Sequence, residues 1–146
     1  MERHSWKIEG LDIQPHLIEL AKYNAELCSL NIKFHLANLC TFTVETPYTL
    51  ILSNPPWQPL GTGKISPYPS KNISHFELLC SLPDILSFLV RNLAPEGDAL
   101  LLYPDFRIFE LQTLIPKTPL DIFDLTPCVG LDKYYICHIR CKGTKQ

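Results

Sequence analysis

The sequence predicts an α/β fold, an open and mostly parallel sheet with helices on both faces and an antiparallel strand at the carboxyl end. Runs with the apolar period of a strand alternate with runs that have the period of a helix along the 146 residues. The composition is globular, with 46% hydrophobic and 19% charged residues. Polar side chains also follow several strands, where ligands bind in such sheets. We expect one domain over residues 1–146.

The first predicted elements are a strand, a helix and a second strand. Residues 6–13 form a short, partly alternating run that ends near an acid. Pro15 then opens a helix with one broad apolar face through Leu30, because the first helical position tolerates proline. Residues 31–37 alternate again and predict the second strand.

The centre of the chain combines a third strand with a long loop. Residues 48–52 are β-prone and lead into Ser53 and Asn54. Residues 55–74 hold five prolines and two glycines in twenty residues, which predicts a loop. Loops of this length inside compact domains are usually functional or disordered.

The second half of the chain predicts two further helical regions and three further strands. Residues 75–93 have a helical period that Pro83 interrupts, so we expect either a kink there or two abutting helices. We then expect a turn at 95–97, a buried strand over 99–103, a helix over 106–114, and strands over 120–125 and 133–141. The last two strands are expected to pair antiparallel through the turn between them.

Charge and cysteine content restrict the class of function. The net charge is −2, and the Lys and Arg residues are scattered, so the sequence does not support a large nucleic-acid-binding surface. One flipped base or one protein side chain remains open as a substrate.

The six cysteines form no C-x-x-C pair, which indicates free thiols in a reducing cytoplasm. We exclude a metal site at Cys137, His138 and Cys141, because a strand points His138 away from both cysteines. No segment has the apolar length of a signal core or membrane span, so we expect a cytoplasmic protein.

Polar side chains follow three predicted strands. They are Asp12, Asn38 and Asn54, and the last of them begins the run Asn54-Pro55-Pro56-Trp57. The carboxyl ends of parallel strands form one edge of a sheet, so we expect these side chains to face a common ligand.

Asn54-Pro55-Pro56-Trp57 resembles the Asn-Pro-Pro-aromatic signature of amino-directed, HemK-like methyltransferases, a class I family that uses S-adenosylmethionine. The resemblance covers Glu9 to Tyr103, since Gly10-Leu11-Asp12-Ile13 is similar to the family's second strand and residues 93–97 to the approach to its fifth. It implies a Rossmann-like fold and methyl transfer to a planar nitrogen, either a nucleobase amine or a protein glutamine amide.

The resemblance assigns catalytic roles to Asn54, Pro55, Pro56 and Trp57. The Asn54 oxygen and the Pro55 carbonyl would accept the two N–H groups of the substrate amine, and the prolines would hold that carbonyl rigid. Trp57 would stack on the substrate. The alternative is a turn after the strand, with Trp57 as a packing anchor.

The resemblance also assigns Asp12, Ile13, Asn38 and Leu39 to cofactor binding. Asp12 would accept the ribose hydroxyls of S-adenosylmethionine, and Ile13 would lie against its adenine. Asn38 and Leu39 would contact the same adenine, but Asn38 stands where the family usually has Asp. The alternatives are a helix N-terminal acid for Asp12 and a turn residue for Asn38.

The family's first strand and glycine-rich loop have no counterpart, because only eleven residues, with Gly10 as their one glycine, precede Asp12. We therefore expect an N-terminally truncated fold, whose exposed sheet edge a protein partner covers. A non-catalytic remnant that serves as a binding or scaffold subunit is the second hypothesis. A nicotinamide-dependent dehydrogenase is a third, but it leaves Asn54 to Trp57 unexplained.

Overall fold

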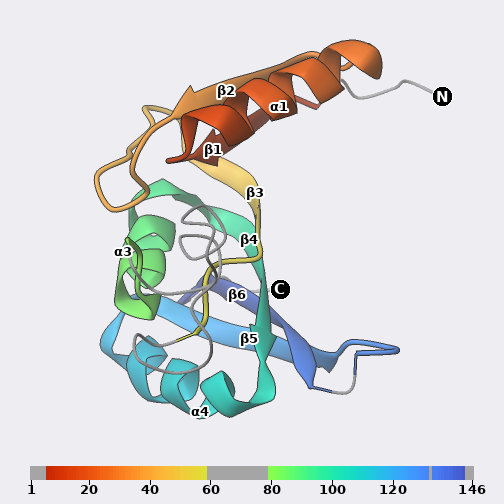
Figure 1. Cartoon of the computed structure of the whole chain (residues 1–146). Helices are drawn as coiled ribbons and strands as arrows, with labels where there is room; N and C mark the ends of the chain where they lie inside the picture. Colours follow the sequence, from red (N-terminus) through yellow and green to blue (C-terminus); the bar gives the residue numbers. More distant parts are fainter. Residues whose placement is uncertain (1–5, 59–78, 132, 144–146) are drawn as a thin grey trace, which may run out of the picture. The chain divides into compact units, whose positions relative to one another are not determined.

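The computed structural model describes residues 6–58, 79–131 and 133–143 (Figure 1). The chain divides into two compact units, Met1–Phe42 and Thr43–Gln146, called unit 1 and unit 2 below. Each unit is described by itself, and the expectation of a single domain stays a prediction.

Unit 1 is a parallel two-stranded sheet with one helix packed on it (Figure 1). Its elements are β1 (Ile8–Asp12), α1 (Pro15–Leu27) and β2 (Ile32–Leu36). The register runs from Ile8 opposite Ile32 to Asp12 opposite Leu36. Gly10 is required for this packing, because a Cβ atom there would lie 2.8 Å from the Phe34 ring. The predicted strand, helix and strand are all confirmed, and Pro15 begins the helix as expected.

Unit 2 contains a four-stranded sheet in the order β3-β4-β6-β5. Its strands are β3 (Tyr48–Ser53), β4 (Leu93–Pro104), β5 (Leu120–Pro127) and β6 (Tyr134–Cys141). β3 pairs parallel with β4, and β6 pairs antiparallel with both β4 and β5. β3, β4 and β5 therefore run in one direction, with the last strand inserted between β4 and β5 against them. The α/β fold class with an antiparallel C-terminal strand is confirmed. The protein partner expected at the sheet edge stays a prediction.

The helices of unit 2 are α3 (Leu82–Asn92) and α4 (Asp105–Leu114), and the short 3-10 helix η1 (Ile115–Lys117) follows α4 (Figure 1). The kink expected at Pro83 is wrong, because Pro83 lies in the first turn of α3, where its missing N–H costs nothing. Ser81 caps this helix, and its N–H and Oγ–H both donate to Asp84 Oδ2, at 2.9 and 2.6 Å. Residues 75–78 of the expected helical region lie outside the described residues, so the alternative of a separate helix before α3 stays a prediction.

The turn expected at residues 95–97 is absorbed into β4 as an irregularity in its pairing. Leu93 lies opposite Tyr48, but the next paired residue, Asp98, lies opposite Leu50, so four residues of β4 face one of β3. Gly97 allows this crowding, because a Cβ atom there would lie 2.9 Å from the carbonyl oxygen of Tyr48. The expected strand over 99–103 is confirmed within this longer one.

The core of unit 2 lies under one face of its sheet. Alternate residues of β4, namely Ala99, Leu101 and Tyr103, are fully buried, as are Cys137 and Ile139 of the neighbouring β6. The buried side chains of α3 include Leu82, Ile85, Leu86 and Leu89. Each large apolar side chain buried in this way contributes about 1.5–3 kcal/mol to folding. Burial also raises the pKa of the Cys137 thiol to about 12, which leaves that cysteine a packing residue.

Candidate functional site

The run from Asn54 to Trp57 leaves the end of β3 and turns into the protein. Asn54 follows the last strand residue and is exposed, whereas Pro55 is buried and Pro56 and Trp57 are half-buried. Neither proline has an N–H, so neither can extend the pairing of β3 with β4. The exposed Asn54 thus lies directly after the end of β3. The two residues that follow it, Pro55 and Pro56, have fixed φ angles.

Arg107 of α4 holds the far end of this segment. Its Nη1 donates a hydrogen bond of 2.7 Å to the Trp57 carbonyl oxygen. Its Nε lies 2.9 Å from Glu110 Oε2, and the arginine side chain is only 4% exposed. The guanidinium carbon lies 6.0 Å from the centre of the Tyr103 ring. A buried arginine with a carboxylate partner therefore fixes the main chain at residue 57.

The Trp57 ring is packed against two aromatic rings from other elements. Its centre lies 5.8 Å from that of Phe106 and 5.9 Å from that of Tyr134, with interplanar angles of 75° and 74°. Both contacts are therefore T-shaped, so neither neighbouring ring stacks parallel to the Trp57 ring. The Asp105 N–H donates to the Lys133 carbonyl oxygen at 2.9 Å, which ties the start of α4 to the chain before β6. Trp57 therefore packs against two rings in this structure, and its stacking on a substrate stays a prediction.

In unit 1, Asp12 lies at the end of β1 with one carboxylate oxygen already bonded. Oδ1 accepts the Gln14 N–H at 2.8 Å, and the Asp12 carbonyl accepts the Ala37 N–H at 3.1 Å. Oδ2 has no partner among the described residues. Asp12 and Ile13 are both half-buried, so both remain reachable from solvent.

Asn38 forms a turn just past β2. Its Oδ1 accepts the Cys40 N–H at 2.9 Å, and its carbonyl accepts the N–H groups of Thr41 and Phe42, at 3.1 and 3.0 Å. The side-chain oxygen is therefore engaged in the turn, which leaves the amide nitrogen as the group that a ligand would meet. Leu39 within this turn is half-buried.

The structure brings the predicted site residues together in two groups. Asp12, Ile13, Asn38 and Leu39 lie at the adjacent ends of β1 and β2 in unit 1, and residues 54–57 lie at the end of β3 in unit 2. The catalytic and cofactor-binding roles of these residues stay predictions.

Arg107 is the residue that sequence reasoning missed. In the sequence, Arg107 and Glu110 are three residues apart on a short helix, a spacing that ordinarily indicates an exposed ion pair. The carbonyl that Arg107 binds belongs to a residue 50 positions earlier, so no local pattern could have indicated the contact.

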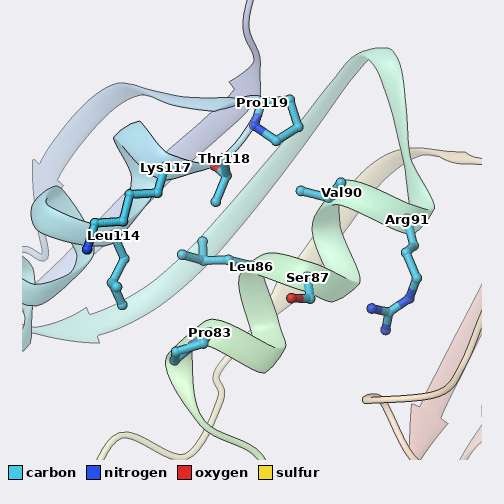
Figure 2. Close-up of a pocket in the computed structure, with 9 residues that line it drawn as sticks. All are labelled: Pro83, Leu86, Ser87, Val90, Arg91, Leu114, Lys117, Thr118 and Pro119. Atoms are coloured by element: carbon cyan, nitrogen blue, oxygen red, sulfur yellow. The ribbon is translucent and has the colours of Figure 1, made fainter.

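A separate cavity of about 380 Å³ lies beside α3 (Figure 2). Leu86, Val90 and Arg91 of α3 line it together with Leu114 and Lys117, and the close-up shows Leu86 and Val90 pointing from α3 toward Leu114 and Thr118. None of the predicted site residues lines this cavity. Among the residues that the structure describes, no helix has the length and apolar character needed to cross a membrane.

No family model matches the chain. Over 53 residues the chain is 43% identical to a protein of Methanocaldococcus jannaschii named as a protein N5-glutamine methyltransferase. That match covers 36% of this chain and 26% of the relative, so the chain spans about a quarter of the relative's length.

Solved structures resemble the chain over nearly its whole length. A ribosomal protein L11 methylase from Lactobacillus delbrueckii subsp. bulgaricus superposes with a TM-score of 0.66 and 13% identity, over 94% of this chain and 59% of the methylase. A TehB-like S-adenosylmethionine-dependent methyltransferase from Corynebacterium glutamicum gives a TM-score of 0.62 with 14% identity, over 93% of this chain and 68% of that one. The chain has the class I methyltransferase fold. Identities this low establish the methyltransferase fold alone.

Proposed function

We propose that the chain is an S-adenosylmethionine-dependent methyltransferase domain that acts on a planar amino nitrogen. The observation that carries this proposal is the position of Asn54-Pro55-Pro56-Trp57 directly after β3 in a methyltransferase fold, with Asn54 exposed and the Trp57 carbonyl held by Arg107.

The residues of this run suit a poor nucleophile. The lone pair of an amide or exocyclic amine nitrogen is delocalised, so the nitrogen must be held in a reactive orientation. Asn54 Oδ1 and the Pro55 carbonyl each accept one N–H of the substrate, and two acceptors define the plane of the amino group. Because the prolines fix φ, the main chain that carries the Pro55 carbonyl does not reorganise when the substrate binds.

Asp12 fits the ribose of the cofactor. Its Oδ1 is held by the Gln14 N–H, so the carboxylate keeps one orientation and presents Oδ2 for a hydroxyl group. Ile13 offers an apolar contact for the adenine, and Asn38 has its amide nitrogen available. S-adenosylmethionine supplies an electrophilic methyl group when bound, and the role of these residues is to bind and orient it.

The acceptor that we propose is a protein glutamine amide, with a nucleobase amine as the alternative. The similarity to the Methanocaldococcus jannaschii relative, which is named as a protein N5-glutamine methyltransferase, supports the amide. The net charge of −2 also argues against a long contact with a phosphate backbone, although one flipped base needs little basic surface.

The proposal is tested with tritiated S-adenosylmethionine and two acceptors, a glutamine-containing peptide and an adenine-containing single-stranded oligonucleotide. We expect the parent chain to label the peptide and Asn54→Ala to reduce the rate at least about a hundredfold, since a misplaced acceptor can cost that much. Asn24→Ala is the matched control, because Asn24 is exposed on α1. Transfer that persists in Asn54→Ala contradicts the assigned role.

Calorimetry with S-adenosylhomocysteine separates catalysis from cofactor binding. We expect the parent and Asn54→Ala to bind it equally, and Asp12→Ala to bind it more weakly. A parent chain that binds no cofactor would instead support the second hypothesis, a non-catalytic subunit.

A further inference from the structure

Arg107 is an unusual residue to find buried beside the candidate site. Removing a guanidinium from water costs several kcal/mol unless the charge is paired and its N–H groups are bonded. Arg107 is 4% exposed, and its partners are Glu110 at 2.9 Å and the Trp57 carbonyl at 2.7 Å. One hydrogen bond of this buried, charged side chain therefore goes to the main chain of the motif, at Trp57.

The motif segment depends on a contact of this kind. Residues 54–57 belong to neither a strand nor a helix, and Pro55 and Pro56 have no N–H to donate. Between Asn54 and Trp57 the two prolines can therefore be held only through their carbonyl groups and their rings. Arg107 supplies a charge-assisted donor to one carbonyl, which is the stronger class of hydrogen bond.

We propose that Arg107 is a positioning residue for the Asn54–Trp57 site. By fixing the Trp57 carbonyl, it sets the path of the two prolines and hence the direction of the Pro55 carbonyl and the Trp57 ring. Glu110 in turn fixes the guanidinium, since it lies three residues further along α4. The inference rests on the proposed function for its catalytic consequence, but the conformational consequence can be measured without any substrate.

Lysine cannot replace arginine in this arrangement. The guanidinium donates a hydrogen bond to a carbonyl through Nη1 while its Nε lies 2.9 Å from a carboxylate, at a distance that makes an ion pair without an aligned hydrogen bond. A lysine ammonium is a point charge on a flexible stem, so one nitrogen cannot take both positions. Arg107→Lys therefore keeps the positive charge but releases the motif.

Trp57 itself reports on this release. The chain has two tryptophans, Trp6 and Trp57, and Trp6 is 72% exposed, so Trp6→Phe leaves Trp57 as the only tryptophan at little structural cost. In that background we expect Arg107→Lys and Arg107→Met to raise the acrylamide quenching constant of Trp57 about twofold or more, since a tethered half-buried ring becomes mobile. Arg140→Lys is the matched control, because Arg140 also pairs with a carboxylate, Asp98, in the same unit.

Glu110→Gln provides a second test in case the Arg107 variants fail to fold. It keeps Arg107 and its bond to Trp57 but loosens the guanidinium, so we expect quenching to rise in the same direction by a smaller amount. Folding is checked by the cooperativity of thermal unfolding. If folded Arg107→Lys and Glu110→Gln both quench as the parent does, Arg107 does not position the motif.

Catalysis provides the second measurement. With the glutamine-containing peptide we expect Arg107→Lys to lower kcat about tenfold or more, with S-adenosylhomocysteine affinity unchanged, because orientation is lost without loss of the cofactor contacts. A variant that only weakened cofactor binding would overturn the inference. Should the parent transfer no methyl group, the proposed function fails while the quenching experiment still decides the role of Arg107.

Discussion

At Asp98, two donors from β6 converge on one carboxylate oxygen. Arg140 Nε donates to Oδ1 at 2.6 Å and His138 Nε2 at 2.7 Å, and Arg140 also stacks on Phe123, with its guanidinium carbon 3.9 Å from the ring centre. The hydrogen bond from Arg140, followed by that from His138, holds the pKa of the Asp98 carboxyl below its usual value of 3.8. These contacts join β4, β5 and β6 on the sheet face opposite the buried Cys137 and Ile139.

We expect Asp98→Asn to destabilise the protein more at neutral pH than in acid. A carboxyl whose pKa is lowered in the folded state stabilises the fold above the unfolded pKa, and this contribution is lost as the pH falls through the folded pKa. At pH 7 the loss should be below about 1 kcal/mol, because the Asp98 side chain is 36% exposed and its ion pairs are screened. Urea unfolding at pH 7 and pH 3 measures the difference, which should be smaller at the lower pH, because the carboxyl becomes protonated as the pH approaches the lowered folded pKa.

The control for this prediction is Asp121→Asn, an exposed acid on the neighbouring β5. It should change the free energy of unfolding little at either pH. A loss for Asp98→Asn that is equal at both pH values would show that packing, and not the ionised carboxylate, is responsible.

At the scale of single elements, α3 depends on its first turn. Ser81 and Asp84 form a capping box, in which Asp84 Oδ2 accepts both donors of Ser81. The side-chain hydrogen bond from Ser81, followed by the backbone one, lowers the pKa of Asp84. We expect Asp84→Ala to lower the free energy of unfolding by about 1 kcal/mol, measured by urea unfolding at pH 7. If Asp84→Ala costs no more than Asp121→Ala, the cap does not stabilise α3.

The helices and strands of this chain were predictable where one apolar period persists. The bounds of α1, α4, β5 and β6 lie close to those that the sequence pattern predicts. The kink expected at Pro83 was wrong because proline is tolerated in the first turn of a helix and disrupts the middle of one. In the sequence, only Ser81 as a helix N-cap indicates that Pro83 lies in a first turn. The extension of β4 through Gly97 was missed because it depends on the backbone of Tyr48 in another strand.

For the candidate site, the sequence predicted the positions of the residues but not their contacts. Asp12, Asn38 and Asn54 follow strands as the sequence indicated. The turn made by Asn38, the T-shaped packing of Trp57 and the hydrogen bond from Arg107 were not settled by sequence, because each depends on which partner lies nearby in space.

At the scale of the whole molecule, the two units bury very different amounts of side chain. The buried residues among those described in unit 1 are Gln14, Ile18 and Ala25, whereas β4, β6 and α3 of unit 2 bury complete faces. A two-stranded sheet is marginal alone, and local opening is easiest where few apolar contacts must be broken. We therefore expect amides of β1 and β2 to exchange with deuterium much faster than those of β4 and β6, as measured by mass spectrometry of peptides. Uniform protection across both units would contradict this expectation.

The cofactor should reverse part of this difference. A ligand that binds only the folded state stabilises it by about 2.7 kcal/mol at a hundred times its dissociation constant. Asp12 is the last residue of β1, and Asn38 follows the end of β2. S-adenosylhomocysteine at that concentration should therefore slow amide exchange in these two strands by up to about a hundredfold. Asp12→Ala should abolish this protection without changing exchange in β4 and β6, which contain no proposed cofactor ligand. Protection that appears only in unit 2, or that persists in Asp12→Ala, would place the cofactor away from Asp12 and contradict the proposed binding residues.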